Sequence, residues 1–299
     1  MQIRGINIAD TFAEAFSMYG TRVIVTAEND KWAKTAAREA TGFATSIIEC
    51  GIEAGIEKKL SPDETIDGRP GYSLLFFTMK KENLKKELRK RVGQTIMTAA
   101  TTACFNGLNS KEKIKVGGDI RYFGDGYQIS KLYGDRRFWR IPIMGGEFLI
   151  EESFGIQKGI AGGNIIIAAE NQSSALKAAE NAVDKMREVK GIVMPFPGGI
   201  VSSGSKVESK YSFLNAATNT YYCPTIKAQT ESKLRENTGA VYEIVIDGLS
   251  THSVAQAMRR GIKAAALPGV IEITAGNYGG DLGTENFYLH EILRGDLDE

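Results

Sequence analysis

The residues of this sequence best suited to chemistry are carboxylic acids set in apolar stretches. Glu243 is the leading candidate, because it interrupts the strand-like run VYEIVIDGL with no adjacent cation. Alternation along a strand puts Glu243 and Asp247 on one face and Ile244 and Ile246 on the other. A carboxyl group desolvated in this way has a raised pKa, and in its neutral form it can donate a proton or a hydrogen bond. The alternative is a water-exposed sheet face, on which Glu243 is an ordinary surface acid.

Three further acids, Asp125, Glu151 and Glu152, lie beside glycine turns and form a second rank of candidates. Asp125 stands in YFGDGYQ, and Glu152 follows Glu151 in IEESFG. Carboxylates at such positions also cap turns, so a structural role remains open for each.

The sequence offers little for nucleophilic or metal catalysis. A Ser-His-Asp or Cys-His site needs a histidine, and the two histidines, His252 and His290, are better explained as structural residues. Cys104 in TTACFNG is better explained as a buried apolar side chain. No pair of His, Cys or carboxylate residues has a recognised metal-ligand spacing. We therefore expect no metal site.

The glycine-rich stretch GIVMPFPGGIVSSGSKV resembles a phosphate-binding loop only superficially. Ser205 separates the last glycine from Lys206, and Pro195 and Pro197 lack the N–H groups that a phosphate cradle uses. What remains is a strand over 192–194 that breaks into a turn where a backbone can approach a ligand closely. A tight turn without any ligand is the equal alternative.

Four strand-helix-strand units follow one another along the chain. Two of them share the tripeptide AEN between strand and helix, in RVIVTAENDKWAK and NIIIAAENQSSALK. We expect N-caps at Asp30, at Ser173 or Ser174, and at Ser250. An earlier helix over 12–19 is predicted from the capping box that joins Thr11 to Glu14.

Pairing these units two by two predicts an α+β protein with two ferredoxin-like (βαββαβ) α/β sandwich lobes. We place the N-terminal lobe at residues 1–147 and the C-terminal lobe, with the proposed catalytic glutamate, at 148–299. The long irregular region 202–239 interrupts the C-terminal half, and its length favours a functional or interface role.

Composition and charge narrow the possible partners. With 37 basic and 36 acidic residues the net charge is +1, so nothing recruits nucleic acid or an anionic membrane. Three cysteines without a C-x-x-C spacing fit a reducing compartment, and the N-terminus shows no signal or transit pattern. We therefore expect a cytoplasmic protein that has no nucleic-acid or membrane partner.

Many segments together resemble one enzyme family. The stretches DTFAEAF, KWAKTAAREATGF, DGRPG, YFGDGYQ, EESFGIQKGIAGGN, PFPGGIVSSGSKVESK, YCPT, VYEIVIDGL and AGNYGGDLG look like those of formylmethanofuran:tetrahydromethanopterin N-formyltransferases. The resemblance runs in order from Ile3 to about Leu293 without large gaps.

This resemblance implies transfer of a formyl group between formylmethanofuran and N5 of tetrahydromethanopterin, in archaeal methanogenesis or methylotroph one-carbon metabolism. The resemblance implies that the two carriers are substrates and that no prosthetic group is needed. The attacking amine belongs to one of the carriers, which explains why the sequence offers few nucleophiles. The family's key glutamate falls on Glu243, as proton donor and oxyanion stabiliser of a tetrahedral intermediate. The resemblance also implies two-lobed subunits that assemble into homotetramers.

We further expect the segment 195–203 to form a backbone wall of the substrate cleft, so that Gly199→Val raises KM with the fold intact. The expected substrate-binding residues are Pro195, Phe196, Pro197, Gly198, Gly199, Ser202, Ser203, Asp125 and Glu152. Two alternatives stay open: a related hydrolase subunit that releases formate, and a non-catalytic tandem ferredoxin-like binding module.

Overall fold

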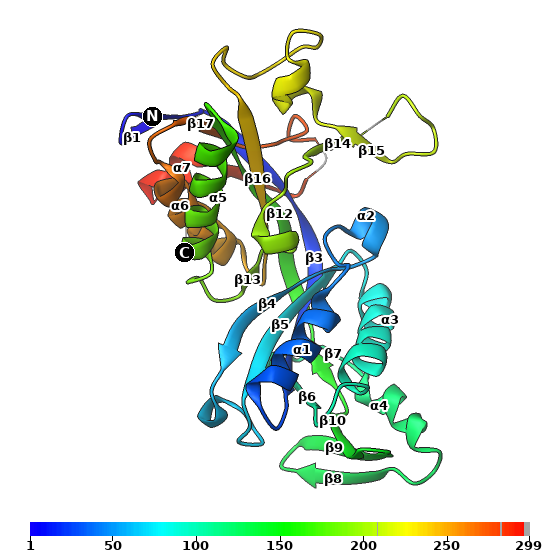
Figure 1. Ribbon diagram of the computed structural model, residues 1–299. Coiled ribbons are helices and arrows are strands. Elements are labelled where there is room, and N and C mark those ends of the chain that lie inside the picture. Colours follow the sequence, from blue (N-terminus) through cyan, green and yellow to red (C-terminus); the bar gives the residue numbers. More distant parts are fainter. Residues whose placement is uncertain (208, 282, 296–299) are drawn as a thin grey trace. The chain divides into compact units, whose positions relative to one another are not determined.

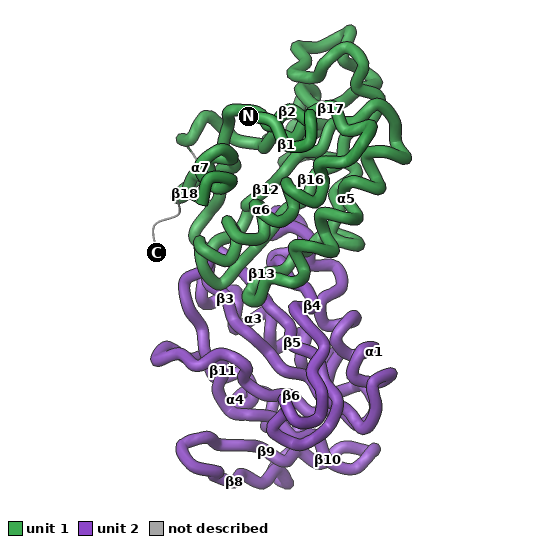
Figure 2. Tube along the Cα trace, turned by 90° about the vertical axis from the view of Figure 1, so that its left-hand side faces the viewer, with its two compact units in different colours: residues 1–17, 160–299 green, residues 18–159 purple. Residues whose placement is uncertain are grey.

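The computed structural model describes residues 1–207, 209–281 and 283–295, and its contacts divide the chain into two compact units. Figure 2 colours them separately: unit 1 comprises Met1–Ser17 and Ile160–Glu299, and unit 2 comprises Met18–Gly159. The first seventeen residues thus pack with the C-terminal half of the chain. The division into lobes at residues 1–147 and 148–299 stays a prediction.

Unit 2 contains a complete βαββαβ arrangement. Its elements are β3 (Phe12–Thr26, which begins in unit 1), α1 (Asp30–Thr41), β4 (Glu53–Leu60), β5 (Gly71–Thr78), α3 (Lys81–Arg91) and β6 (Ala103–Asn106). The strands follow the order β4-β5-β3-β6 and all pair antiparallel, which is the order of a ferredoxin-like sheet.

Three strands extend this sheet beyond β6. The additional elements of unit 2 are α2 (Ile47–Cys50), β7 (Lys113–Ile114), α4 (Gly117–Ile120), β8 (Ile129–Tyr133), β9 (Arg136–Ile143), β10 (Gly146–Glu151) and β11 (Phe154–Gly155). β10 pairs parallel with β6, and β9 and β8 follow it antiparallel.

Unit 1 repeats the arrangement with a second set of elements, labelled in Figure 1. They are β12 (Gln157–Ala169), α5 (Gln172–Met186), β13 (Ile192–Val193), β16 (Ala240–Gly248), α6 (Thr251–Ala265) and β17 (Val270–Thr274). The order β13-β16-β12-β17 again matches a ferredoxin-like sheet. The predicted α+β class with two such lobes is therefore confirmed.

Shorter elements complete unit 1. They are β1 (Gln2–Ile3), β2 (Ile6–Ile8), β14 (Ser205–Val207), β15 (Ala216–Thr218), β18 (Glu285–Tyr288) and α7 (Leu289–Arg294). β2 extends the sheet beside β17, whereas β14 and β15 form a small sheet of their own. No helix of the described residues is long and apolar enough to cross a membrane.

Asparagine, not the residue predicted, caps two of the helices. The Asn29 side chain accepts from Trp32 N–H at the start of α1, and the Asn171 side chain accepts from Ser174 N–H at the start of α5. The prediction of Asp30 and of Ser173 or Ser174 is thus wrong by one to three residues, because the asparagine of each AEN tripeptide already satisfies the free amides. The predicted cap of α6 at Ser250 is confirmed.

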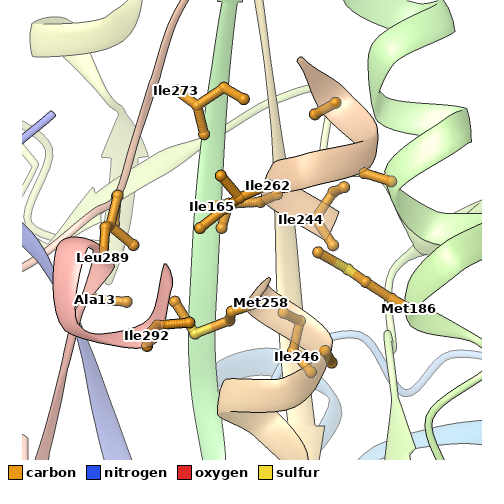
Figure 3. Close-up of a cluster of buried hydrophobic side chains, with 14 of the residues drawn as sticks. Ala13, Ile165, Met186, Ile244, Ile246, Met258, Ile262, Ile273, Leu289 and Ile292 are labelled. Carbon is orange, nitrogen blue, oxygen red and sulfur yellow. The ribbon is translucent and has the colours of Figure 1, made fainter. Parts of the chain in front are cut away.

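The core of unit 1 lies between the sheet and helices α5 and α6. Figure 3 shows Ile244 and Ile246 of β16 within this cluster, with Met186 of α5 and Met258 and Ile262 of α6. Because side chains alternate along a strand, the residues of β16 between these two isoleucines and beside them face away from the helices.

The helix predicted over 12–19 is wrong, because these residues belong to the long strand β3. Ala13 and Ala15 are fully buried, and they pair with Phe287 and Glu285 of β18. Tertiary pairing therefore outweighs the local capping-box signal between Thr11 and Glu14.

Gly163 provides a test of how tightly α6 is packed on the sheet. A Cβ at this position would lie 2.4 Å from Cγ1 of Val254, so we expect Gly163→Ala to destabilise the protein by about 1–3 kcal/mol. Urea denaturation would measure the change, with Gly145→Ala as control because a Cβ there meets no atom within 4 Å. Equal midpoints for both variants would contradict this packing.

Candidate functional site

Glu243 lies on the face of β16 that is turned away from the helices, in a row of three residues across three strands. Its partner on β12 is Ile166, whose partner on β17 is Thr274. On its other side Glu243 exchanges two backbone hydrogen bonds with Val201, with N···O distances of 2.7 and 3.1 Å. The backbone of Glu243 is therefore fixed from both sides.

An irregular segment, residues 219–239, contacts this face of the sheet. Arg235 pairs with Glu272 of β17 at 3.4 Å, and burial, followed by the charges of Glu272 and Glu243, raises the pKa of Tyr222. Ile166 is only 2% exposed although it lies outside the core cluster under the helices. The row that contains Glu243 is thus covered on this face as well.

Burial is the cause of the perturbed acidity of Glu243. Desolvation raises the pKa of its carboxyl group from 4.5 to about 7. An ion pair with a cation would lower the pKa of this carboxyl group again. Among the described residues no cation forms such a pair with Glu243. Near neutral pH the group can therefore both give up and take up a proton.

A glycine-rich loop, of which residues 276–281 and 283 are described, is held beside the same row. The buried carboxylate of Glu14 accepts hydrogen bonds from the amides of Tyr278 (2.7 Å), Gly280 (3.0 Å) and Gly283. Asn164 accepts from the amide of Gly276 at 2.6 Å and donates to its carbonyl at 3.1 Å. Burial, followed by the charges of Glu243 and Glu14, raises the pKa of Tyr278.

The predicted turn Pro195–Gly199 interrupts the pairing of one strand edge. Val193 pairs with Asp247 and Val201 with Glu243, so the residues between them form an excursion from the edge of β16. Gly198 has φ +67° and open space at its Cβ position, whereas a Cβ on Gly199 (φ +90°) would lie 3.0 Å from Val183 of α5. The expectation that Gly199→Val leaves the fold intact is therefore wrong, because Gly199 packs against the helix.

The remaining predicted residues fall into two groups. Ser202 and Ser203 directly follow Val201 and are exposed, so the structure brings them close in the chain to the partner of Glu243. Asp125 and Glu152 belong to unit 2.

Each of these two acids has a local role within unit 2. Asp125 is exposed at the end of a 3-10 turn with φ +51°, and Glu152 pairs with Arg137 at 3.2 Å. Contact of either residue with a substrate stays a prediction.

Sequence reasoning missed Tyr222, Thr274 and Glu14 as residues around the site. Tyr222 lies in an irregular segment without periodicity, and Glu14 was assigned to a helix cap. The only available signal was for Thr274, which ends an alternating strand immediately before the AGNYGG turn.

Comparisons with known proteins cover the whole fold. The family profile for formylmethanofuran-tetrahydromethanopterin formyltransferase matches residues 1–143, and the profile for the proximal lobe of the same family matches residues 146–292. The formyltransferase of Methylococcus capsulatus is 54% identical over 98% of this chain and 100% of its own length. That of Methanothermobacter thermautotrophicus is 51% identical over the same shares. One component of the formyltransferase/hydrolase complex of Methylorubrum extorquens is 48% identical over 97% of each chain.

Two solved structures agree with these relatives. The formyltransferase of Methanosarcina barkeri superposes with a TM-score of 0.92 at 49% identity, over 98% of this chain and 100% of its own. One chain of the formyltransferase/hydrolase complex of Methylorubrum extorquens, solved with methylofuran, superposes with a TM-score of 0.95 at 48% identity, over 98% of this chain and 98% of its own.

Burial of Glu243 should appear in the pH dependence of stability. Its folded-state pKa lies above the unfolded one, so the folded state binds the extra proton, and its stability falls as pH rises from about 4.5 to 7. Glu243→Gln cannot ionise, so its stability relative to wild type should increase over this window by up to about 3 kcal/mol. Melting temperatures at pH 5 and pH 8 measure the gap, and a gap independent of pH would show that Glu243 is well solvated.

Proposed function

Because this chain belongs to the formylmethanofuran-tetrahydromethanopterin formyltransferase family, we propose that its Glu243 is the proton donor in formyl transfer between these two carriers. The chain is a formyltransferase, and methanofuran and tetrahydromethanopterin serve it as substrates. The role of Glu243 is supported by one observation above the others, a desolvated carboxyl group whose pKa lies near 7. This property suits a group that must exchange protons at neutral pH.

The reaction needs one proton-transfer group and a fixed geometry. The acceptor amine N5 attacks the formyl carbon and forms a new C–N bond, while the carbonyl π electrons move onto the oxygen. The tetrahedral intermediate then reforms its carbonyl, the bond to the methanofuran nitrogen breaks, and the departing amine takes the proton of Glu243. The acceptor nitrogen returns its own proton to the carboxylate, so Glu243 ends each turnover as it began. In its neutral form the same carboxyl group can donate a hydrogen bond to the oxyanion.

The exposed part of the site supplies the proposed substrate contacts. Ser202 and Ser203 follow the residue paired with Glu243, and Pro197 and Gly198 form the exposed tip of the neighbouring excursion. We assign these residues to substrate binding in preference to Gly199, which is occupied by packing against α5. Asp125 and Glu152 remain proposed contacts from unit 2.

Formate release is the second candidate activity, and it is favoured by one comparison. The Methylorubrum extorquens relative is part of a formyltransferase/hydrolase complex. Water in place of the acceptor amine would convert the same tetrahedral intermediate into formate. The non-catalytic binding module is set aside, because the chain belongs to a family of enzymes.

The activity itself should depend on the protonated carboxyl group. We expect purified protein to form 5-formyl product from formylmethanofuran and tetrahydromethanopterin, with kcat/KM falling about tenfold per pH unit above pH 7. Glu243→Gln should lower kcat by about 10²–10⁴-fold and remove this pH step. Absorbance of the formylated pterin measures both, and an unimpaired variant would remove Glu243 from the chemistry.

Omission of the acceptor distinguishes the two activities. A transferase releases no formate from formylmethanofuran alone, whereas a hydrolase does so at the rate of turnover. Formate release without any pterin product would identify hydrolysis as the activity of this chain.

A homotetramer in the cytoplasm completes the proposal. The resemblance to the family supports the assembly, and the three free cysteines support a reducing compartment. Light scattering coupled to size exclusion should give four times the mass of one chain; a stable monomer that turns over would contradict the assembly.

A further inference from the structure

Glu14 is a buried acid of β3 whose carboxylate binds one loop. Its Oε2 accepts from the amides of Tyr278 at 2.7 Å and Gly280 at 3.0 Å, and its Oε1 accepts from the amide of Gly283. Glu14 is only 2% exposed, so water competes little for these bonds. Hydrogen bonds from N–H groups to a carboxylate are about twice as strong as those between neutral groups. A single side chain therefore holds the glycine-rich loop, of which residues 276–281 and 283 are described.

The glycines of this loop fit tightly around the carboxylate. A Cβ on Gly283 would lie 2.5 Å from Cγ of Glu14 and 2.6 Å from the carbonyl oxygen of Ala15. Gly279 and Gly280 have φ values of +86° and +87°, which residues with a side chain rarely adopt. These three glycines therefore allow the loop to wrap around Glu14.

The first residue of the loop lies on the sheet face that carries Glu243. Asn164 of β12 bonds with both the amide and the carbonyl of Gly276. A Cβ on Gly276 would lie 3.6 Å from Cδ1 of Ile166, which is the partner of Glu243 on β12. The loop thus begins beside the residue paired with Glu243 and continues to Glu14.

We propose that this loop forms one wall of the substrate site and that Glu14 is its positioning residue. The role of the wall in catalysis rests on the formyl transfer proposed above, whereas the hold of Glu14 on the loop can be measured without any substrate. Glycine-rich backbone allows a ligand to approach closely, and the loop starts next to the residue that pairs with the proposed proton donor. Glu14 itself touches no substrate, because its carboxylate is buried and bonded to the loop. It acts through the backbone that it fixes.

Glu14→Gln is the variant that tests this hold. The amide of glutamine has nearly the shape of the carboxylate, but its NH2 group donates and would face loop amides that also donate. A buried donor that loses its acceptor destabilises the arrangement that contains it. The pairing of Glu14 with Asn286 of β18 is made by the backbone, so the strand should stay in place while the loop is released.

The first experiment follows amide hydrogen exchange by mass spectrometry. In Glu14→Gln the amides of Tyr278 and Gly280 should exchange about tenfold faster or more than in wild type, while those of β16 stay protected. Glu285→Gln is the matched control, because it removes an exposed acid from the neighbouring strand β18. Ile262→Ala removes a buried side chain on the helix side of the sheet, so it should lower the melting temperature without releasing the loop.

The second experiment uses the active enzyme. When a released loop spends about one tenth of its time in the binding conformation, the apparent affinity for a ligand falls about tenfold. KM for at least one of the two carriers should therefore rise about tenfold in Glu14→Gln, while kcat stays within about twofold because bound substrate holds the loop in place. Glu285→Gln and Ile262→Ala should keep the KM of the wild type.

A milder variant covers the case in which Glu14→Gln fails to fold. Glu14→Asp keeps the charge on a side chain that is one methylene shorter, so it cannot reach all of the amides that Glu14 binds. Exchange of the loop and KM should both increase in this variant, by smaller factors than in Glu14→Gln.

Two results would overturn the proposal. One is loop exchange that stays at the wild-type rate in both variants of Glu14, and the other is faster exchange with an unchanged KM for both carriers. Wild-type protein that forms no formylated pterin would instead overturn the proposed function. The wall would then be tested by calorimetric titration with each carrier, in which equal affinities of wild type and Glu14→Gln would overturn it as well.

Discussion

The alternation of side chains along β16 is the constraint on which the candidate site depends. Ile244 and Ile246 must point into the core under α5 and α6, so Glu243 is directed to the opposite face by the geometry of the strand. A slip of one residue would bury the carboxyl group among the helices and expose the isoleucines. The same apolar residues that stabilise unit 1 therefore fix the orientation of its chemical group.

A carboxyl group on an uncovered sheet face would ordinarily be hydrated and fully ionised at neutral pH. Here irregular chain lies on this face, the segment 219–239 through Arg235 and the glycine-rich loop through Gly276. Coverage by loops differs physically from coverage by a helix, because loops can leave room for a substrate at their edges while they still exclude water. The burial that raises the pKa of Glu243 therefore comes from loops on this face of the sheet.

Sequence patterns sufficed for the architecture and for the face of β16 on which Glu243 lies, because both are expressed in local periodicity. The four strand-helix-strand units, the Ser250 cap and the face of Glu243 all follow from alternation and helical spacing. The assignment of 12–19 to a helix failed because the capping-box residue Glu14 bonds instead to amides more than 260 residues away. The ion pair of Arg235 with Glu272 was beyond local reasoning for the same reason, since it joins segments that share no pattern.

The excursion after β13 shows how glycine can serve two purposes in one turn. Gly199 has a positive φ and no space for a side chain, so packing against Val183 accounts for it fully. Gly198 shares the backbone requirement but faces open space, so its positive φ alone accounts for a glycine at this position. Because Val201 returns to pair with Glu243 directly after this turn, any shift of the excursion would move the strand edge beside the carboxyl group. The packing of Gly199 and the position of Glu243 are in this way coupled through a single backbone pairing.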